Sequence, residues 1–165
     1  MSFNRMLRHL CATRAGTRRR FTDAIDTAIE SAIQAAEKRS SGEIRFVIET
    51  ALDIPELWAR LTPRERAEQV FSQFRVWDTE LRNGVLIYVL VADRDVEIVA
   101  DRGAAARIAP ADWEAACLIM ESHFRSGRFA EGALGGVAAV GGLLEREFPF
   151  RSGDRDELPN QPTLL

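Results

Sequence analysis

The sequence predicts an α/β domain in which helices cover both faces of a small mixed sheet, a three-layer α/β/α sandwich. Three observations support this prediction. Apolar residues recur at helical spacing in several segments. The continuous apolar run 85–91 is typical of a strand buried on both faces. The predicted order α, β, α, β, β, α, α allows a parallel strand pair with a right-handed crossover, extended antiparallel by the last strand.

The first helix and the first strand follow one another closely. Apolar residues between Phe21 and Ala36 lie on one helical stripe, and the polar step Ser40 to Gly42 ends the helix. Ile44, Phe46 and Ile48 then alternate at the two-residue period of a strand.

The second helix begins at a capping box, with Thr62 as the cap, Pro63 at the first helical position and Glu65 at the third. The buried strand 85–91 comes next and forms the centre of the sheet. A polar turn, Asp93 to Asp95, connects it to a return strand over 96–100, which predicts an antiparallel hairpin.

Two further helices complete the domain, over about 110–124 and 129–147. Prolines punctuate the polar segment that follows. The predicted organisation is therefore a basic N-terminal tail over 1–20, an α/β domain over 21–148 and a disordered C-terminal tail over 149–165.

Charge distinguishes the N-terminal tail from the body. The tail carries six Arg and no acid, so the formal net charge of −3 leaves −9 on residues 21–165. We expect no nucleic-acid partner for such a body. Two interpretations of the tail stay open: a solvated basic tail, or an amphipathic helix resting on anionic lipid. Lipid contact would use Arg14, Arg18, Arg19 and Arg20, together with Arg8 and the apolar residues Phe3, Met6, Leu7 and Leu10.

The same segment lacks the continuous apolar stretch and the cleavage site of a secretory signal. No apolar run approaches the roughly 20 residues that span a bilayer. We therefore expect a cytoplasmic protein, with peripheral contact at the inner face of the membrane if the tail binds lipid.

Polar side chains should gather where the two parallel strands start and the third strand ends. The residues are Glu43, Asp78, Glu80, Asn83, Asp101 and Arg102. Carboxylates and an amide oxygen suit Ca²⁺ or Mg²⁺, and an Arg can hold a phosphate oxygen. The alternative is a set of solvated loop acids. The opposite end holds Glu49, Asp53, Asp93 and Asp95, where open α/β sheets usually bind ligands.

Four stretches resemble one known family: 41–44 (Ser-Gly-Glu-Ile), 67–71, 83–87 (Asn-Gly-Val-Leu-Ile) and 124–132. The chain resembles the TPM domain family, named from a thylakoid lumen protein, a photosystem II repair protein and a modulator of a levamisole receptor. The resemblance covers about Ile25 to Phe148. The run 76–80 (Val-Trp-Asp-Thr-Glu) is similar to a bacterial branch without a signal peptide.

The resemblance implies a three-layer α/β/α domain, with divalent-metal binding in some members, weak acid phosphatase activity in some, and service to membrane complexes in others. Members often have an acid directly before the Asn-Gly pair, where this chain has Arg82. They often have a Gly-aromatic-Gly step after the third strand, where this chain has Asp101-Arg102-Gly103. Both departures weaken the inference that this chain has the metal site of the family.

Two functions follow as hypotheses. The first is a non-catalytic accessory domain that binds a protein partner in a membrane or other complex. It is favoured by the family resemblance and because the pattern places no Ser or Cys nucleophile beside a base. Zinc-ligand spacing, a P-loop and a dinucleotide fingerprint are missing, so the sequence gives no support to nucleotide hydrolysis. The second is a weak metal-dependent acid phosphatase, with Asp78, Glu80 and Asp101 around Ca²⁺ or Mg²⁺ and Arg102 on the phosphate.

Overall fold

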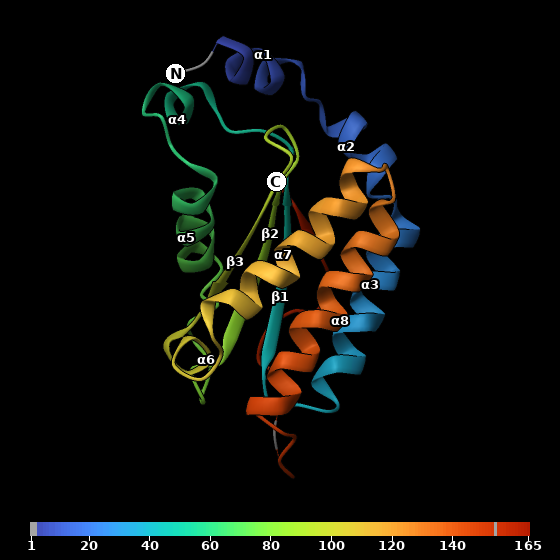
Figure 1. The fold of residues 1–165 in the computed structure, drawn as a ribbon, viewed down its shortest axis with the longest axis vertical. Helices are drawn as coiled ribbons and strands as arrows, with labels where there is room; N and C mark the ends of the chain where they lie inside the picture. Colours follow the sequence, from blue (N-terminus) through green and yellow to red (C-terminus); the bar gives the residue numbers. More distant parts are fainter. Residues whose placement is uncertain (1–2, 154) are drawn as a thin grey trace.

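The computed structural model describes residues 3–153 and 155–165, which form one layered α/β domain (Figure 1). Its elements are, in order, α1 (Phe3–Cys11), α2 (Arg14–Arg20), α3 (Asp23–Glu37), β1 (Glu43–Glu49), α4 (Ile54–Trp58), α5 (Pro63–Gln73), β2 (Gly84–Leu90), β3 (Asp95–Ala100), α6 (Arg102–Ala105), α7 (Pro110–Arg125), α8 (Phe129–Glu147) and β4 (Thr163–Leu164). The predicted fold class is confirmed.

The sheet has the strand order β3-β2-β1-β4. β1 pairs with β2 in parallel from Glu43 opposite Gly84 to Glu49 opposite Leu90. β2 pairs with β3 antiparallel, with Val85 opposite Ala100. The predicted pairing of these three strands is therefore confirmed, and β4 adds a short parallel strand beside β1.

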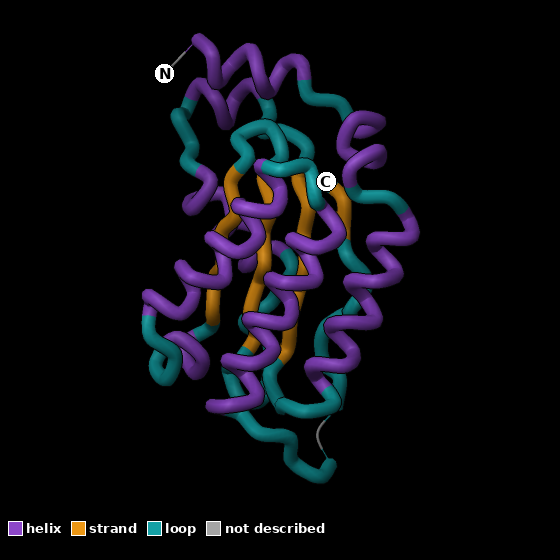
Figure 2. The backbone as a smooth tube through the Cα atoms, turned by 45° about the vertical axis from the view of Figure 1, so that its right-hand side comes forward, coloured by secondary structure: helices purple, strands orange, loops and turns teal. Residues whose placement is uncertain are grey.

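Apolar side chains pack on both faces of this sheet. Figure 2 shows helices lying in front of the strands. Ile44, Phe46 and Ile48 of β1 contribute to the core beneath α3, α7 and α8. Val47 and Tyr88 contribute to the second core, beneath α5. Every residue of β1 and β2 is buried, which explains the continuous apolar run of β2.

Close approach explains two of the glycines. A Cβ atom on Gly136 of α8 would lie 2.2 Å from Met120 Sδ of α7, so the two helices pack more closely than a larger residue allows. A Cβ atom on Gly84 would lie 1.9 Å from the Val76 carbonyl oxygen. The first residue of β2 is thus held against the end of the preceding loop.

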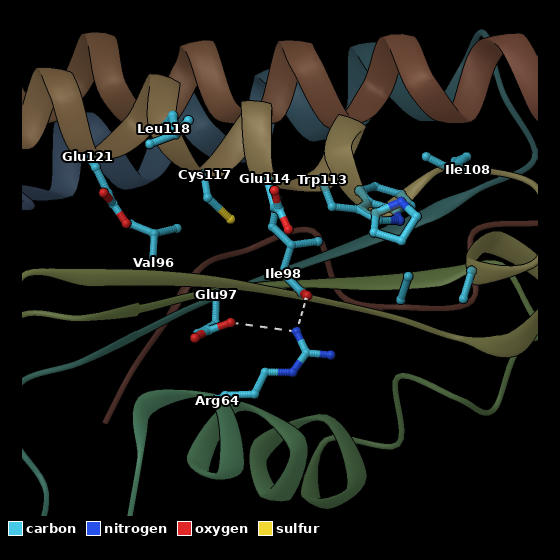
Figure 3. A pocket seen from close by; sticks show the side chains of 13 residues that line it. Arg64, Val96, Glu97, Ile98, Ile108, Trp113, Glu114, Cys117, Leu118 and Glu121 are labelled. Atoms are coloured by element: carbon cyan, nitrogen blue, oxygen red, sulfur yellow. Dashed lines mark hydrogen bonds and ion pairs between the residues drawn. The ribbon is translucent and has the colours of Figure 1, made fainter.

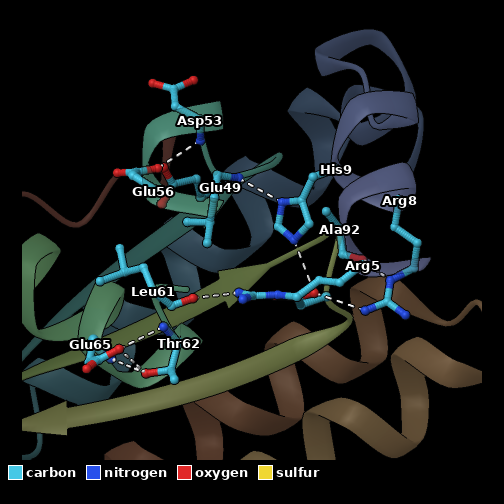
Figure 4. Close-up of polar contacts among 12 residues, drawn as sticks. Arg5, Arg8, His9, Glu49, Asp53, Glu56, Leu61, Thr62, Glu65 and Ala92 are labelled. Carbon is cyan, nitrogen blue, oxygen red and sulfur yellow. Dashed lines mark hydrogen bonds and ion pairs between the residues drawn. The ribbon is translucent and has the colours of Figure 1, made fainter. Parts of the chain in front are cut away.

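The N-terminal segment 3–20 forms the helices α1 and α2, and α1 is bound to the end of the sheet. Figure 4 shows Arg5, Arg8 and His9 pointing toward the β2–β3 turn at Ala92. Arg5 Nε donates to Asp93 Oδ2 at 2.9 Å, and Arg8 Nη2 donates to Asp93 Oδ1 at 3.1 Å. A solvated tail therefore does not describe this segment, because three side chains of α1 are paired inside the molecule.

The C-terminal segment also differs from the expectation of disorder. Its residues 163–164 pair with β1, and Leu158 is buried in the second core. The buried Arg45 accounts for this order, because its guanidinium donates to Pro159 O at 2.6 Å, to Gln161 O at 2.9 Å and to Thr163 Oγ1. A buried guanidinium needs these acceptors, so the segment and β1 stabilise each other.

None of the helices in the described part of the chain is long and apolar enough to cross a membrane.

Candidate functional site

The predicted site residues lie at the amino end of the sheet, defined here as the end where β1 and β2 begin and β3 finishes. Glu43 is the first residue of β1, directly opposite Gly84 of β2. Asp101 follows β3, and its backbone N–H donates to Gly84 O at 2.9 Å. The structure thus brings Glu43, Asn83 and Asp101 to one end of the sheet.

Asn83 and Asp101 are buried, and each side chain uses one polar atom for a hydrogen bond with the backbone. Asn83 Nδ2 donates to the Ser41 carbonyl oxygen, which joins the loops that precede β1 and β2. Asp101 caps α6, since its Oδ1 accepts from Arg102 N at 2.7 Å. Asn83 Oδ1 and Asp101 Oδ2 remain buried without a hydrogen-bond partner.

Asp78, Glu80 and Arg102 are exposed. The backbone N–H of Glu80 donates to the Glu157 carboxylate at 3.1 Å, so the loop 78–83 lies against the C-terminal segment. Within residues 3–153 and 155–165, only one group of three or more acidic, His or Cys side chains approaches closely enough to share an ion, and it consists of Glu37, Glu43 and Asp156.

This second set of residues, with Asn160, is the acidic cluster. One carboxylate oxygen from each of Glu37, Glu43 and Asp156 lies within 4.8 Å of the others. Glu37 ends α3, Glu43 begins β1, and Asp156 belongs to the C-terminal segment. Asn160 Nδ2 donates to Asp156 Oδ2 at 2.9 Å. All four residues line a cavity of about 320 Å³.

Burial and mutual repulsion dominate the electrostatics of the cluster. Burial, followed by the charge of Glu43, raises the pKa of Glu37 to about 8. Burial likewise raises the pKa of Glu43 to about 7, although hydrogen bonds from Leu158 N and Glu157 N oppose the rise. The folded chain therefore destabilises the charged forms of both groups. A cation at this position would reverse that effect.

Sequence reasoning found Glu43 but missed Glu37, Asp156 and Asn160. Glu37 stood six residues before Glu43 and next to the apolar stripe residue Ala36, which is a signal that could have been used. The other two lay in the segment for which disorder was expected. Leu158 between them, the one large apolar residue of 155–160, was the available sign of packing.

The carboxyl end of the sheet, where β1 and β2 finish, has its acids paired with cations. Glu49 forms a bidentate pair with Arg66, with Nε and Nη2 at 2.9 and 2.8 Å, and also accepts from Tyr88 OH at 2.6 Å. Asp93 binds Arg5 and Arg8, and His9 Nε2 lies 3.1 Å from its Oδ1. Burial alone would raise the pKa of Asp93, but hydrogen bonds from these three side chains lower it below its usual value.

A cavity of about 570 Å³ runs along the free edge of β3 (Figure 3). Cys117 of α7 points into it, but burial, followed by the charge of Glu97, raises the pKa of this thiol to about 12. Because the thiolate is the reactive form, this cavity does not hold an activated cysteine nucleophile.

The comparisons with known proteins agree with this architecture. The model of the TPM domain matches residues 18–143. The chain belongs to the TPM domain family. Because the match ends at residue 143, the acidic cluster includes two residues, Asp156 and Asn160, that lie outside the matched part of this TPM domain.

Solved structures of bacterial proteins are similar to this TPM domain. The BA42 protein of Bizionia argentinensis is 34% identical, with a TM-score of 0.77 over 87% of this chain and 94% of its own. The N-terminal domain of a protein from P. gingivalis is 22% identical, with a TM-score of 0.61 over 77% of this chain and 78% of its own. The N-terminal domain of the cg2496 protein from Corynebacterium glutamicum is 15% identical, with a TM-score of 0.55 over 74% and 73%. A search of curated proteins found no match.

Proposed function

We propose that this TPM domain is a non-catalytic accessory domain that binds a protein partner, in a membrane or other complex, through the end formed by α1 and α4. The supporting observation is a group of large apolar side chains in solvent. We call them the α1–α4 surface: Phe3 (76% exposed), Trp58 (70%), Leu10 (58%), Ile54 (56%) and Leu7 (50%). Phe3, Leu7 and Leu10 share one helical face. Phe3 and Trp58 line one shallow cavity, so the two helices contribute to a single surface.

A protein partner suits this surface better than anionic lipid does. A lipid-binding helix needs free cations beside its apolar face. Arg5 and Arg8 are instead paired with Asp93, Arg14 donates to Leu164 O, and Arg18 pairs with Asp26. Exposed aromatic side chains are typical anchors of protein–protein interfaces. Lipid contact through Arg14, Arg18, Arg19 and Arg20 remains the competing prediction.

A matched set of variants tests the docking proposal. Phe3→Ser/Trp58→Ser removes the two most exposed aromatic side chains of the surface, and Leu118→Ser removes a comparably exposed apolar side chain from α7 (63% exposed). Wild type and Leu118→Ser should retain the same protein from solubilised membranes, and the double variant should lose it. Equal retention by all three would contradict the proposal. Flotation of wild type on anionic vesicles, lost with the double variant and without any protein partner, would assign the surface to lipid.

A second candidate function is weak metal-dependent acid phosphatase activity. The specific observation in its favour is that two oxygens, Asn83 Oδ1 and Asp101 Oδ2, are buried without a hydrogen-bond partner. Asn83 precedes Gly84 in the chain, and Asp101 N donates to Gly84 O at 2.9 Å. Asp78 and Glu80 would add carboxylates from the adjacent exposed loop, and Arg102 would bind the phosphate. Against it stands Arg82, which places a positive charge directly before Asn83.

Hydrolysis of p-nitrophenyl phosphate with added Mg²⁺ or Ca²⁺ tests this candidate. Asp101→Asn is the informative variant, because Asn retains the capping oxygen of α6 while losing the charge. Activity lost in Asp101→Asn and retained in Glu97→Gln, a matched substitution on β3, would support a phosphatase. Activity that survives replacement of Asp78, Glu80 and Asp101 together would exclude these residues.

A further inference from the structure

The strand β3 forms one edge of the sheet, and no strand within residues 3–153 and 155–165 pairs with its outer side. Asp101 N, one residue past β3, donates to Gly84 O at 2.9 Å. In an antiparallel pair such hydrogen-bonded positions alternate, so every second residue before Asp101 also faces β2. The residues between them direct their backbone N–H and C=O groups away from β2: Val96, Ile98 and Ala100. Such outward groups can pair with an added strand.

The side chain of Arg64 shows that these groups are open to a hydrogen-bonding partner. Arg64 Nη1 of α5 donates to Ile98 O at 2.7 Å (Figure 3). Val96 and Ala100 accept no side-chain hydrogen bond of this kind in the part of the chain that the structure describes. Arg64 is half exposed, and its Nε is held separately by Glu68 Oε1 at 2.9 Å. An incoming strand would therefore displace only the contact made by Nη1.

The cavity of about 570 Å³ lies beside this edge, between β3 and α7 (Figure 3). Val96, Ile98 and Ala100 line it from β3, and Trp113 and Cys117 line it from α7. Successive side chains of a strand point to opposite faces of a sheet. Every second side chain of an added strand would therefore contact this largely apolar wall.

Charge determines which kind of strand the edge attracts. Three acids line the cavity: Glu97, Glu114 and Glu121. Arg64, 3.5 Å from Glu97, is the one cation among its described lining residues. Burial, followed by the charges of Glu97 and Glu121, raises the pKa of Asp95 at the start of β3 to about 6. Arg125 lies 3.8 Å from Glu121 but is largely exposed, so it compensates that charge weakly. The edge thus favours a basic segment and disfavours an acidic edge such as β3 of a second copy.

We propose that the outer edge of β3 and the adjacent cavity bind an extended basic segment of a protein partner, which adds to the sheet as a further strand. In this mode of recognition, backbone hydrogen bonds supply affinity and side-chain contacts supply specificity. Val96 and Ala100 provide the backbone groups, and the acids of the cavity select Lys or Arg side chains. The site uses none of the residues of the α1–α4 surface and goes beyond the function proposed for it.

Fluorescence anisotropy of a labelled Val-Lys-Val-Lys-Val-Lys peptide, titrated with the full-length protein, tests the proposal. This peptide should bind saturably, and the matched Val-Glu-Val-Glu-Val-Glu peptide should not bind. A third peptide has the Val-Lys sequence with N-methyl groups on two adjacent central residues. Because successive N–H groups point to opposite edges of a strand, it lacks a donor on both edges and should bind at least tenfold more weakly. Equal affinity of the methylated peptide would overturn strand addition, since charge alone would then explain binding.

Variants of the protein test the residues of the groove. Glu114→Gln/Glu121→Gln should weaken binding of the Val-Lys peptide at least fivefold. The matched control Asp78→Asn/Glu80→Gln also removes two acids and should bind like wild type. Arg64→Met frees the outward carbonyl of β3 and removes a cation, so it should strengthen binding severalfold, which damage to the fold would not do. Unchanged affinity in Glu114→Gln/Glu121→Gln would overturn the proposal.

Hydrogen exchange locates the bound peptide on the strand. With saturating Val-Lys peptide, exchange at the Val96 and Ala100 amides should slow at least fivefold, because both N–H groups would donate to the added strand. The amide of Val99, which already faces β2, should change little. Absence of saturable binding to wild type, or slower exchange confined to other elements, would overturn the proposal.

Discussion

The two ends of the sheet both bury carboxylates, but they compensate them differently. At the carboxyl end, Glu49 pairs with Arg66, and Asp93 pairs with Arg5 and Arg8. At the amino end, Glu37 and Glu43 lie close to a third carboxylate and form no ion pair in the described part of the chain. The pKa of Asp93 is lowered, whereas the pKa values of Glu37 and Glu43 are raised.

This difference separates acids that hold the fold together from acids available to a ligand. A buried charge with several hydrogen-bonded partners stabilises the arrangement of the elements that supply those partners. A buried charge without such partners destabilises the folded state unless a cation binds beside it. The carboxyl end is thus built around ion pairs within the chain, and the amino end is suited to an added ion.

The largest effect is expected from Asp93→Ala. The substitution leaves Arg5, Arg8 and His9 without their common acceptor, and removing one partner of a buried ion pair costs about 3 kcal/mol. Urea unfolding should therefore show a loss of this size. Asp78→Asn, at an exposed acid, is the control and should change the unfolding free energy by less than about 0.5 kcal/mol. Similar values for both variants would show that the carboxyl end does not depend on its ion pairs.

A smaller effect is expected from Arg45→Met, which removes the donors to Pro159 O, Gln161 O and Thr163 Oγ1. Hydrogen bonds from a charged donor contribute about 2 kcal/mol, so the C-terminal segment should open locally. Hydrogen exchange at the Leu158 amide should become faster, and calcium affinity should fall although no carboxylate has changed. Arg39→Met, at an exposed ion pair with Glu145, should leave both unchanged. Unaltered calcium affinity in Arg45→Met would show that the acidic cluster does not depend on the position of the C-terminal segment.

Glu37→Gln should have the opposite sign to Asp93→Ala. Because the pKa of Glu37 is raised to about 8, the folded chain disfavours its charged form, and the neutral amide avoids this cost. In chelator at pH 8 the free energy of unfolding of the variant should exceed that of wild type by about 1 kcal/mol. Added Ca²⁺ should make wild type more stable than the variant. A destabilised variant in chelator would mean that the Glu37 charge is already compensated.

Acid should act selectively on the carboxyl end. The pKa of Asp93 is lower in the folded protein, so its stabilising contribution is present above the ordinary carboxyl range near 4 and is lost as pH falls through the folded value. The Leu52 amide, which donates to His9 Nδ1 at 3.0 Å, reports on α1. Its protection from hydrogen exchange, corrected for intrinsic rates, should fall below pH 4 before that of the β2 amides. Simultaneous loss would contradict a local effect.

The sequence was sufficient for the central elements because their patterns are strong and local. The apolar run of β2, the capping box at Thr62 and the stripe of α8 each predicted an element that the structure confirms. The terminal segments were not predictable in this way. α1 and the C-terminal segment are held by long-range contacts, among them those with Asp93 and Arg45, which leave no periodic signal in the sequence.

The candidate site was predictable in part for the same reason. Strand order alone placed Glu43, Asn83 and Asp101 at one end of the sheet. Asp156 and Asn160 join that end only because the segment after α8 folds back along β1. The short strand β4 and the buried Leu158 hold this return in place. β4 is not recognisable from local propensity, and Leu158 is a single apolar residue without a periodic pattern around it.

Locating the ion directly tests the contrast between the two ends. Mn²⁺ added in small amounts to the ¹⁵N-labelled, chelator-treated protein broadens the amide signals nearest to its site. The account predicts that the amides of Ile44 and Leu158, which donate to Glu37 and Glu43, broaden first, and that the Leu52 amide at the carboxyl end broadens last. Earliest broadening at the carboxyl end, or uniform broadening over the whole domain, would contradict a cation site at the amino end of the sheet.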